Sequence, residues 1–326
     1  LNTNEETYKG YFYSDYLYSS GISDLSFKID IDYSLNNKHL IKFGSSIKRH
    51  TFLPGFQDIF RDSPEHENYP KAKIDTTILF LTKKNPLTTS IYLENIININ
   101  SNISANIGAH YNLYQIENTS YHSLQPRFSA RYLIDEKSSI KVSYANMNQN
   151  IHLLTNSSIG LPNDIWVPST SSVQPQKSNQ FGLGYYLNIN YGKVGKWIDF
   201  EKHNFEFNIE FYTKKMNHLI SYSEGNNIFG SSFSRWEDRI DLNGFGKSQG
   251  VEFFLQKKTG KWTGWIGYTI SKSTRQFQNI NLGNEYPYKF DRRHDLSFVN
   301  SYKIRDNIIF TSTFIYGTGN SINIPS

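Results

Sequence analysis

The sequence has no cysteine among its 326 residues, which excludes disulfide scaffolds, thiolate metal sites and cysteine nucleophiles. It also has no uninterrupted apolar run of about 18 residues, so a helical membrane protein is excluded as well. The net charge of +5 is spread along the chain without a basic stripe, and no nucleic-acid partner is expected. Aromatic residues make up 16% of the chain, far too many for a disordered polar protein. An ordered, Tyr- and Phe-rich protein remains.

The first residue is Leu1, and neither a basic segment nor an apolar signal core follows it. The last residues, 323–326, close no pattern. These ends predict that residues 1–326 are an internal piece of a longer protein.

Apolar and polar residues alternate with a period of two over much of the chain, which is typical of β-strands. The alternation is cleanest in Leu25–Tyr33, Ile103–Leu113, Phe205–Phe211 and Val251–Leu255. It predicts one face that carries Phe27, Ile29, Ile107, Phe207, Ile209, Val251 and Phe253. The opposite face is predicted to carry Asp30, Asn106, Asn208, Glu210 and Glu252.

The length of these runs distinguishes between two kinds of β protein. The longest runs last about 9 to 13 residues, whereas strands of soluble domains last about 5 or 6. A tilted strand needs about 9 to 11 residues to cross a bilayer. The length therefore favours membrane-crossing strands.

The connections between runs point the same way. Short turns are predicted near Asn36, Asn100, Glu136, Gly260 and Asp306. Longer connections are predicted at His50–Pro70, Ile151–Ser178, Tyr222–Phe245 and Ser273–Lys289. Short turns on one side and long loops on the other are the signature of an antiparallel up-and-down transmembrane β-barrel. If the run Lys71–Leu81 were a full crossing, the later long connections would fall on the side of the short turns. The run is therefore assigned to a loop excursion. Roughly 13 crossings remain.

Several segments resemble the barrel region of TonB-dependent outer-membrane receptors, in the form common among Bacteroidetes. These segments, in the order in which the family has them, are Gln125–Tyr132, Ile151–Pro168, Gly246–Lys257 and Tyr288–Ser297. The resemblance extends over most of the chain from about Lys38 onward.

This resemblance implies an all-β fold that forms part of a 22-stranded barrel. It further implies an N-terminal plug, C-terminal strands and a TonB-contacting segment, none of which lies in this sequence. The expected function is receptor and transporter for energy-coupled uptake of a scarce solute in the bacterial outer membrane. The solute classes left open are metal chelates, corrinoids, oligosaccharides and peptides. The other expected partners are TonB, membrane lipid and a surface lipoprotein.

The densest charge cluster is Asp291–Asp295, and its His294–Asp295 pair could be mistaken for a catalytic pair. No nucleophile lies at a motif spacing that would make His294 a base, so no catalytic residue is predicted. The nine histidines form no metal-binding pair at strand or helix spacing, and neither a metal nor a cofactor is expected. The cluster is interpreted as opposite charges paired on a lumen wall.

Aromatic residues beside charges in the long connections are the candidate ligand contacts, because a ring offers a stacking surface on a segment that can reach solute. The predicted ligand-binding residues are Asp164, Trp166, Arg235, Trp236, Tyr286, Asp291 and Arg293. The competing interpretation is that these aromatics only pack one loop against another.

The alternative class of protein is a soluble or surface-displayed β-rich binding module, such as an adhesin or a lectin-like sandwich. It would use the same loop aromatics. It predicts strands of about 5 or 6 residues in two packed sheets.

Overall fold

The computed structural model describes residues 13–63, 72–79, 83–155, 164–189, 193–194, 198–199, 204–223 and 236–321. Side chains are described in 21–53, 83–155, 164–189, 204–223 and 236–321. Within these residues, no helix is long and apolar enough to span a membrane.

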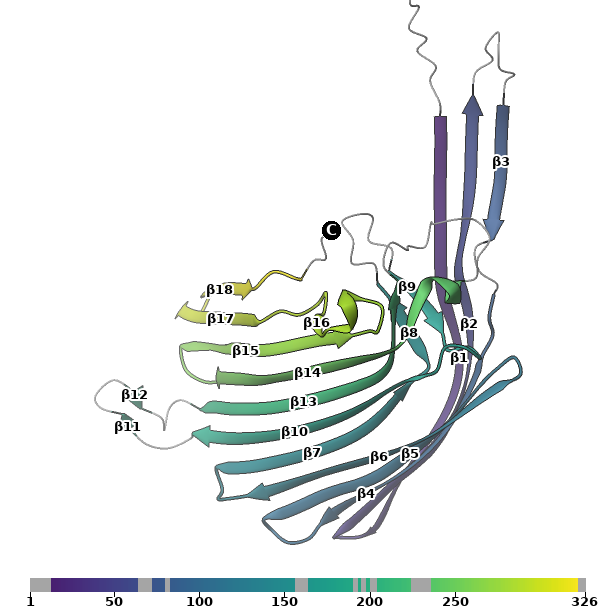
Figure 1. The fold of residues 1–326 in the computed structure, drawn as a ribbon. Coiled ribbons are helices and arrows are strands. Elements are labelled where there is room, and N and C mark those ends of the chain that lie inside the picture. The colour runs from purple at the N-terminus through teal and green to yellow at the C-terminus, as the bar shows by residue number, and fades with distance from the viewer. Residues whose placement is uncertain are drawn as a thin grey trace, which may run out of the picture.

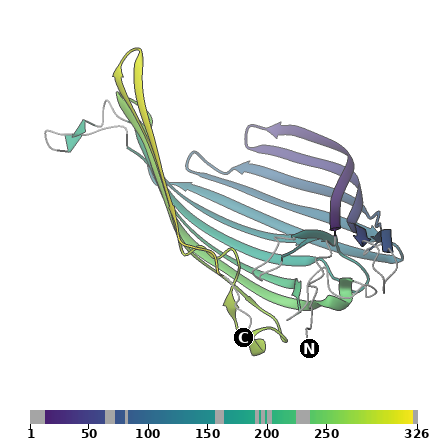
Figure 2. The same ribbon diagram turned by 90° about the horizontal axis from the view of Figure 1, so that it is seen from above.

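One antiparallel sheet dominates the described chain and curves into an open trough (Figures 1 and 2). Its main strands are β1 (Tyr13–Asn36), β2 (His39–Ser63), β4 (Leu87–Asn98), β5 (Ile103–Ile116), β6 (Thr119–Leu133), β7 (Ser138–Gln149), β10 (Gln176–Ile189), β13 (Phe205–Tyr222), β14 (Ile240–Lys257), β15 (Trp262–Gln276), β17 (His294–Arg305) and β18 (Ile308–Gly317). These twelve strands pair in chain order, close to the predicted 13 crossings. A single sheet with strands of 10 to 25 residues contradicts the sandwich alternative.

The smaller elements lie outside this path. They are β3 (Ala72–Leu79), β8 (Ile151–Leu154), β9 (Ile165–Pro168), β11 (Lys193–Val194), β12 (Ile198–Asp199), β16 (Tyr286–Pro287) and the short 3-10 helices η2 (Trp236–Arg239) and η3 (Asn281–Gly283). The first part of β2, His39–Arg49, pairs with β4, while its last part, Phe56–Ser63, pairs with β3. Because β3 never enters the space between β2 and β4, the predicted loop excursion is confirmed.

The predicted connections fall at two opposite ends of the sheet, which we call the turn end and the loop end. Two connections depart from the pattern: β5 and β6 join at the loop end through only two residues, and the connection from β10 to β13 at the turn end carries the β11–β12 hairpin. The predicted loop His50–Pro70 was also too long, because β2 continues to Ser63. Likewise β14 begins at Ile240, inside the predicted loop Tyr222–Phe245. Strands pair beyond the stretch of clean alternation, so the alternation underestimates their length.

The cross-strand register confirms the two predicted faces. Ile209 lies opposite Tyr185 and Phe253, whereas its neighbour Asn208 lies opposite Tyr186. Residues directly opposite share a face, so apolar residues line up across the strands on one side of the sheet. Many apolar residues of this side, such as Phe27 at 65% and Ile107 at 52%, are exposed. They form the lipid-facing surface of a membrane barrel.

The polar face is the concave one. The β8–β9 hairpin packs on this side, because β9 contacts β1 and β2 while β8 contacts β13, and these strands are far apart in the sheet order. The polar face is hydrogen-bonded across strands, as in the Lys42–Asp32 ion pair at 2.9 Å and the bond from the Tyr92 hydroxyl to Asp30 at 2.5 Å. Charged side chains are therefore tolerated on this wall.

Candidate functional site

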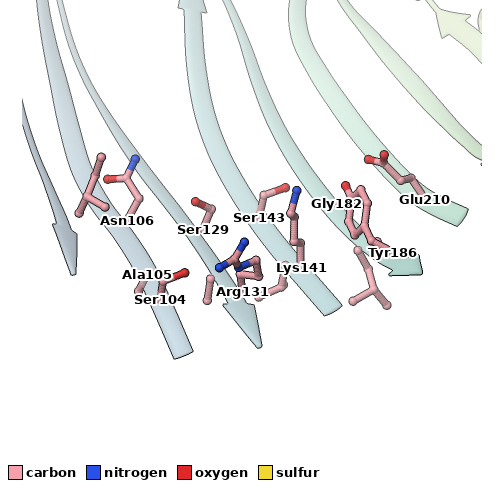
Figure 3. A pocket seen from close by; sticks show the side chains of 15 residues that line it. Ser104, Ala105, Asn106, Ser129, Arg131, Lys141, Ser143, Gly182, Tyr186 and Glu210 are labelled. Atoms are coloured by element: carbon pink, nitrogen blue, oxygen red, sulfur yellow. The ribbon is translucent and has the colours of Figure 1, made fainter. Parts of the chain in front are cut away.

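The concave wall contains a hollow of about 360 Å³ toward the turn end of the sheet (Figure 3). We call it the lumen hollow. Its lining residues include Ser104, Asn106, Ser129, Arg131, Lys141, Ser143, Gly182, Gly184, Tyr186 and Glu210. The two glycines come from β10, where a side chain would collide: a Cβ on Gly182 would lie 2.7 Å from Ser143 Oγ. A Cβ on Gly184 would likewise lie 2.8 Å from the Tyr186 ring, so glycine at these two positions lets neighbouring side chains pack over β10.

At the loop end, the β8–β9 hairpin lies against the inner wall. The Tyr114 hydroxyl donates to the Ser169 carbonyl at 3.1 Å, and the Tyr121 hydroxyl donates to the Thr170 carbonyl at 2.6 Å. The Ser169 amide donates to the Asn150 carbonyl at 2.8 Å. These bonds fasten the segment that follows β9 to β5, β6 and the end of β7.

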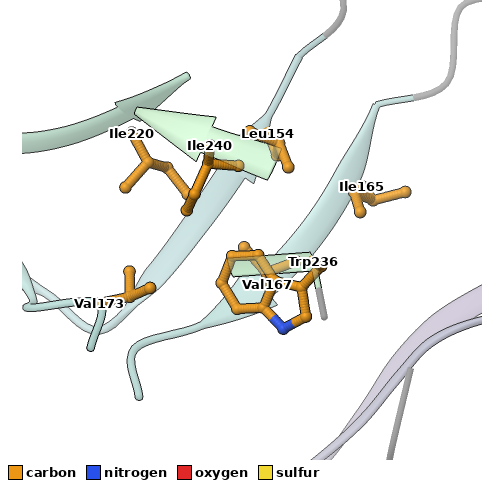
Figure 4. Packing of buried hydrophobic residues seen from close by; sticks show 7 residues of the cluster. All are labelled: Leu154, Ile165, Val167, Val173, Ile220, Trp236 and Ile240. Carbon is orange, nitrogen blue, oxygen red and sulfur yellow. The ribbon is translucent and has the colours of Figure 1, made fainter. Parts of the chain in front are cut away.

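A cluster of buried apolar residues holds the hairpin in place (Figure 4). We call it the mouth cluster. It consists of Leu154, Ile165, Val167, Val173, Ile220, Trp236 and Ile240. Ile220 and Ile240 belong to neighbouring wall strands, and Trp236 begins η2, so the cluster joins three loop-end segments to the sheet. The cluster gives the loop end of the trough, which we call the mouth, a packed core of its own.

His152 is fully buried beneath the hairpin. Gln176 Nε2 donates to His152 Nδ1 at 2.9 Å, which leaves His152 Nε2 to donate to Ser169 Oγ at 3.1 Å. Both ring nitrogens are thus used in the neutral form of the imidazole. Burial lowers the pKa of His152 to about 4; a hydrogen bond with the backbone of Gln174 opposes this shift, and the nearby His218 adds a smaller lowering.

This burial predicts that the hairpin loosens in mild acid. An unfolded histidine has a pKa of about 6.5, so between that pH and about 4 the unfolded hairpin binds more protons than the folded one. The stabilisation is therefore complete above about pH 6.5 and falls by roughly 3 kcal/mol as the pH drops through this window. Amide hydrogen exchange in 151–154 and 165–168 should accelerate at pH 5 relative to pH 7.5, after correction for intrinsic rates. The variant His152→Gln should lose this dependence; an equal dependence in the variant would contradict the assignment.

The sequence-predicted residues Trp166 and Trp236 occupy opposite environments. Trp236 is 8% exposed and packs in the mouth cluster, as the competing interpretation of loop packing expects. Trp166 is 46% exposed, because its neighbours Ile165 and Val167 face the cluster and the alternation of β9 turns the indole away. Arg235 lies outside the described residues. Trp166 is thus the predicted tryptophan that presents a free ring surface.

Asp164 lies beside the loop between β16 and β17. Its Oδ1 lies 3.4 Å from Lys289 Nζ, although the two residues are 125 positions apart in the sequence. The neighbouring Phe290 is 46% exposed, and Lys289 Nζ lies 5.3 Å from the centroid of its ring. The structure therefore brings two of the predicted loops together at the mouth through one ion pair.

The other predicted residues of this loop have structural contacts. Asp291 is buried; its Oδ1 accepts from the Ser273 amide at 2.6 Å and its Oδ2 from Arg293 Nη2 at 3.1 Å. The interpretation of this cluster as paired charges is confirmed, but Asp291 precedes β17 and therefore lies in the loop. Tyr286 packs against a second buried cluster, of Leu219, Phe277 and Ile280, and burial raises the pKa of its hydroxyl.

Sequence reasoning missed the aromatic and cationic residues next to these positions. The Arg275 guanidinium lies 3.6 Å from the ring centroid of Tyr288, and Tyr288 meets Phe290 edge to face at 5.3 Å. With Lys289 they make a charged aromatic surface at the mouth. The run Tyr286–Phe290 has three aromatic residues in five, and this density could have indicated the charged aromatic surface from the sequence.

None of the described His, Asp and Glu side chains gather into a group of three that could hold a metal ion. A protein ligand set for a bare metal is therefore not found in the described part of the chain.

A meander of long antiparallel strands with a lipid-facing apolar surface and a polar concave surface defines the wall of an outer-membrane β-barrel. The family model "TonB dependent receptor-like, beta-barrel" matches residues 1–320. The chain therefore belongs to the TonB-dependent receptor family, whose members reside in the bacterial outer membrane. No curated protein sequence matches the chain.

Solved structures share this fold at low sequence identity. The FrpB iron transporter of Neisseria meningitidis (F5-1 variant) aligns with a TM-score of 0.60 and 13% identity, over 88% of this chain and 42% of that one. The pyoverdine receptor FpvA of Pseudomonas aeruginosa aligns with a TM-score of 0.52 and 12% identity, over 90% and 40%. The ferric-catecholate import receptor Fiu of E. coli K12 aligns with a TM-score of 0.51 and 13% identity, over 91% and 44%. The chain thus spans about two fifths of the length of these relatives.

Proposed function

We propose that the protein is an outer-membrane receptor that captures a scarce solute at its loop end and takes it up through a plugged barrel. The observation that carries this proposal is the construction of the mouth. A hairpin fastened across the concave side presents the exposed ring of Trp166 two residues from Asp164, and Asp164 pairs with Lys289 above a polar wall. Such a surface combines ring stacking with charge.

In this proposal residues 1–326 supply part of the barrel wall. A plug, further strands and the segment that contacts TonB lie outside this sequence, and TonB supplies the energy. A surface lipoprotein that covers the mouth is a further proposed partner. Iron chelates are the first solute class to test, because FrpB, FpvA and Fiu are named for iron, pyoverdine and ferric catecholate. Corrinoids, oligosaccharides and peptides complete the screen.

The test is uptake of labelled solutes from this panel by cells that carry the whole gene, with and without TonB. We expect the cells to take up one solute class of the panel. This uptake should require both the gene and TonB. Trp166→Ala should weaken binding of that solute by about five- to tenfold, because a stacked aromatic contact contributes about 1 kcal/mol or slightly more. Heat-modifiability of the barrel should be unchanged.

The control variant is Trp262→Ala, which removes an exposed tryptophan at the turn end, far from the mouth. It should bind solute normally. If Trp166→Ala and Trp262→Ala behave alike, capture by the β8–β9 hairpin is wrong. Uptake that persists without TonB would contradict the energy coupling.

A further inference from the structure

One row of directly opposite residues on the concave wall carries its cations at one end and its carboxylates at the other. Across β6, β7, β10, β13 and β14, the residues directly opposite one another are Arg131, Lys141, Gly184, Glu210 and Glu252. Like charges that face each other across a strand pair destabilise a sheet. This row places cation opposite cation and carboxylate opposite carboxylate.

The wall does not neutralise its own cation pair. No described carboxylate lies within ion-pair distance of Arg131 or Lys141. Glu210 is two strand spacings from Lys141, about 10 Å away in the sheet, and it hydrogen-bonds to the Tyr186 hydroxyl. Lys141 Nζ lies instead over the Tyr186 ring, 4.0 Å from its centroid. Figure 3 shows this ring between the cations and Glu210.

The same two cations line the lumen hollow of about 360 Å³. The hydroxyls of Ser104, Ser129 and Ser143 line it too, so five side chains with hydrogen-bond donors converge on one space. Arginine forms paired, charge-assisted hydrogen bonds with planar oxyanions, and lysine adds a point charge. The hollow gives these donors a common space in which a carboxylate or phosphate group fits.

We propose that the lumen hollow is a binding subsite for an oxyanion, a carboxylate or phosphate group of a solute that passes along the wall, with Arg131 and Lys141 as its cations. This inference rests on the proposed uptake function, because a lumen-wall site meets a solute only if solute enters the barrel. Because the hollow lies near the turn end, a solute that enters at the mouth would reach it late in its passage. The hollow gives the solute a second contact when it leaves Trp166.

The test is titration of the purified full-length protein in detergent with two probes, inorganic phosphate and citrate, at low and high salt. We expect saturable binding that weakens with salt, and a loss of about tenfold or more in the double variant Arg131→Gln/Lys141→Gln. Lys141→Arg should retain binding. Ser129→Leu, which keeps both cations but adds bulk to the lining of the hollow, should weaken it.

The matched control is Arg127→Gln. Arg127 lies on the same strand and face, opposite Gly108 and Ala145, but does not line the hollow. Binding within about twofold of the wild type in this control would support a defined site. Equal weakening in Arg127→Gln, or no binding of either probe to the wild type, would overturn the proposal.

A plug carboxylate seated in the hollow would give a different pattern. The wild type would then bind neither probe, while Arg131→Gln/Lys141→Gln would make the plug more sensitive to protease. That outcome assigns the cations to the plug and overturns the solute subsite. The titration measures binding and not uptake. It therefore still tests the oxyanion subsite if the protein fails to transport solute or if uptake does not depend on TonB.

Discussion

Replacing Ile209 by arginine is expected to destabilise the folded barrel by about 2 to 4 kcal/mol in lipid. Ile209 lies near the middle of the apolar face, between Tyr185 and Phe253, so the guanidinium would have to leave water for hydrocarbon. Reversible unfolding in lipid vesicles, followed by tryptophan fluorescence, measures this loss of unfolding free energy.

The matched control is Asn208→Arg, one residue away on the concave face, opposite Tyr186 and Phe254. It should change the unfolding free energy by less than about 1 kcal/mol, because its charge stays on the polar wall. If the two variants are equally destabilised, or Asn208→Arg is the worse, the assignment of the two faces is wrong.

Replacing Trp236 by alanine is expected to remove about 3 to 5 kcal/mol from the stability of the mouth cluster, because it empties a packed site. The wall strands pair through their own ladders, so the loss should stay local. Hydrogen exchange should therefore accelerate in 151–154, 165–168 and 236–240 and remain slow in β13 away from its loop end. If the proposed capture of solute at the loop end is correct, solute binding should fall as well, because the hairpin is loosened.

Trp166→Ala is the natural comparison, since it removes the same side chain from an exposed position. It should leave exchange in the mouth cluster within error of the wild type. Fast exchange in Trp166→Ala with normal exchange in Trp236→Ala would reverse the roles assigned to the two tryptophans.

Most of the wall could be predicted from the sequence. The alternation in Leu25–Tyr33 and Phe205–Phe211 identified strands and their two faces, because successive side chains of a strand point to opposite sides whatever lies around them. The parity of turns and loops was sufficient to set Lys71–Leu81 apart as an excursion, and β3 confirms it. Where the alternation weakens, as beyond His50, the strand length was underestimated.

The candidate site could be predicted only in part. Trp166 and Trp236 look equivalent in the sequence, each an aromatic beside a charge in a long connection. The difference arises from contacts with distant segments: Trp236 belongs to a buried cluster that includes Ile220 and Ile240, while Asp164 pairs with Lys289 from 125 positions away. Nothing in the local pattern of either loop encodes those partners.

The sequence by itself determined the class of this protein, since long amphipathic strands joined by alternating turns and loops leave few alternatives to a membrane barrel. Only the tertiary structure decided which loop side chains are packed and which are free, and which wall charges are opposed in one row. The physical reason is the sequence separation of the interacting residues. A strand's faces follow from a period of two residues, whereas the mouth cluster and the Arg131–Lys141 pair depend on register and packing between segments that meet only in the folded sheet.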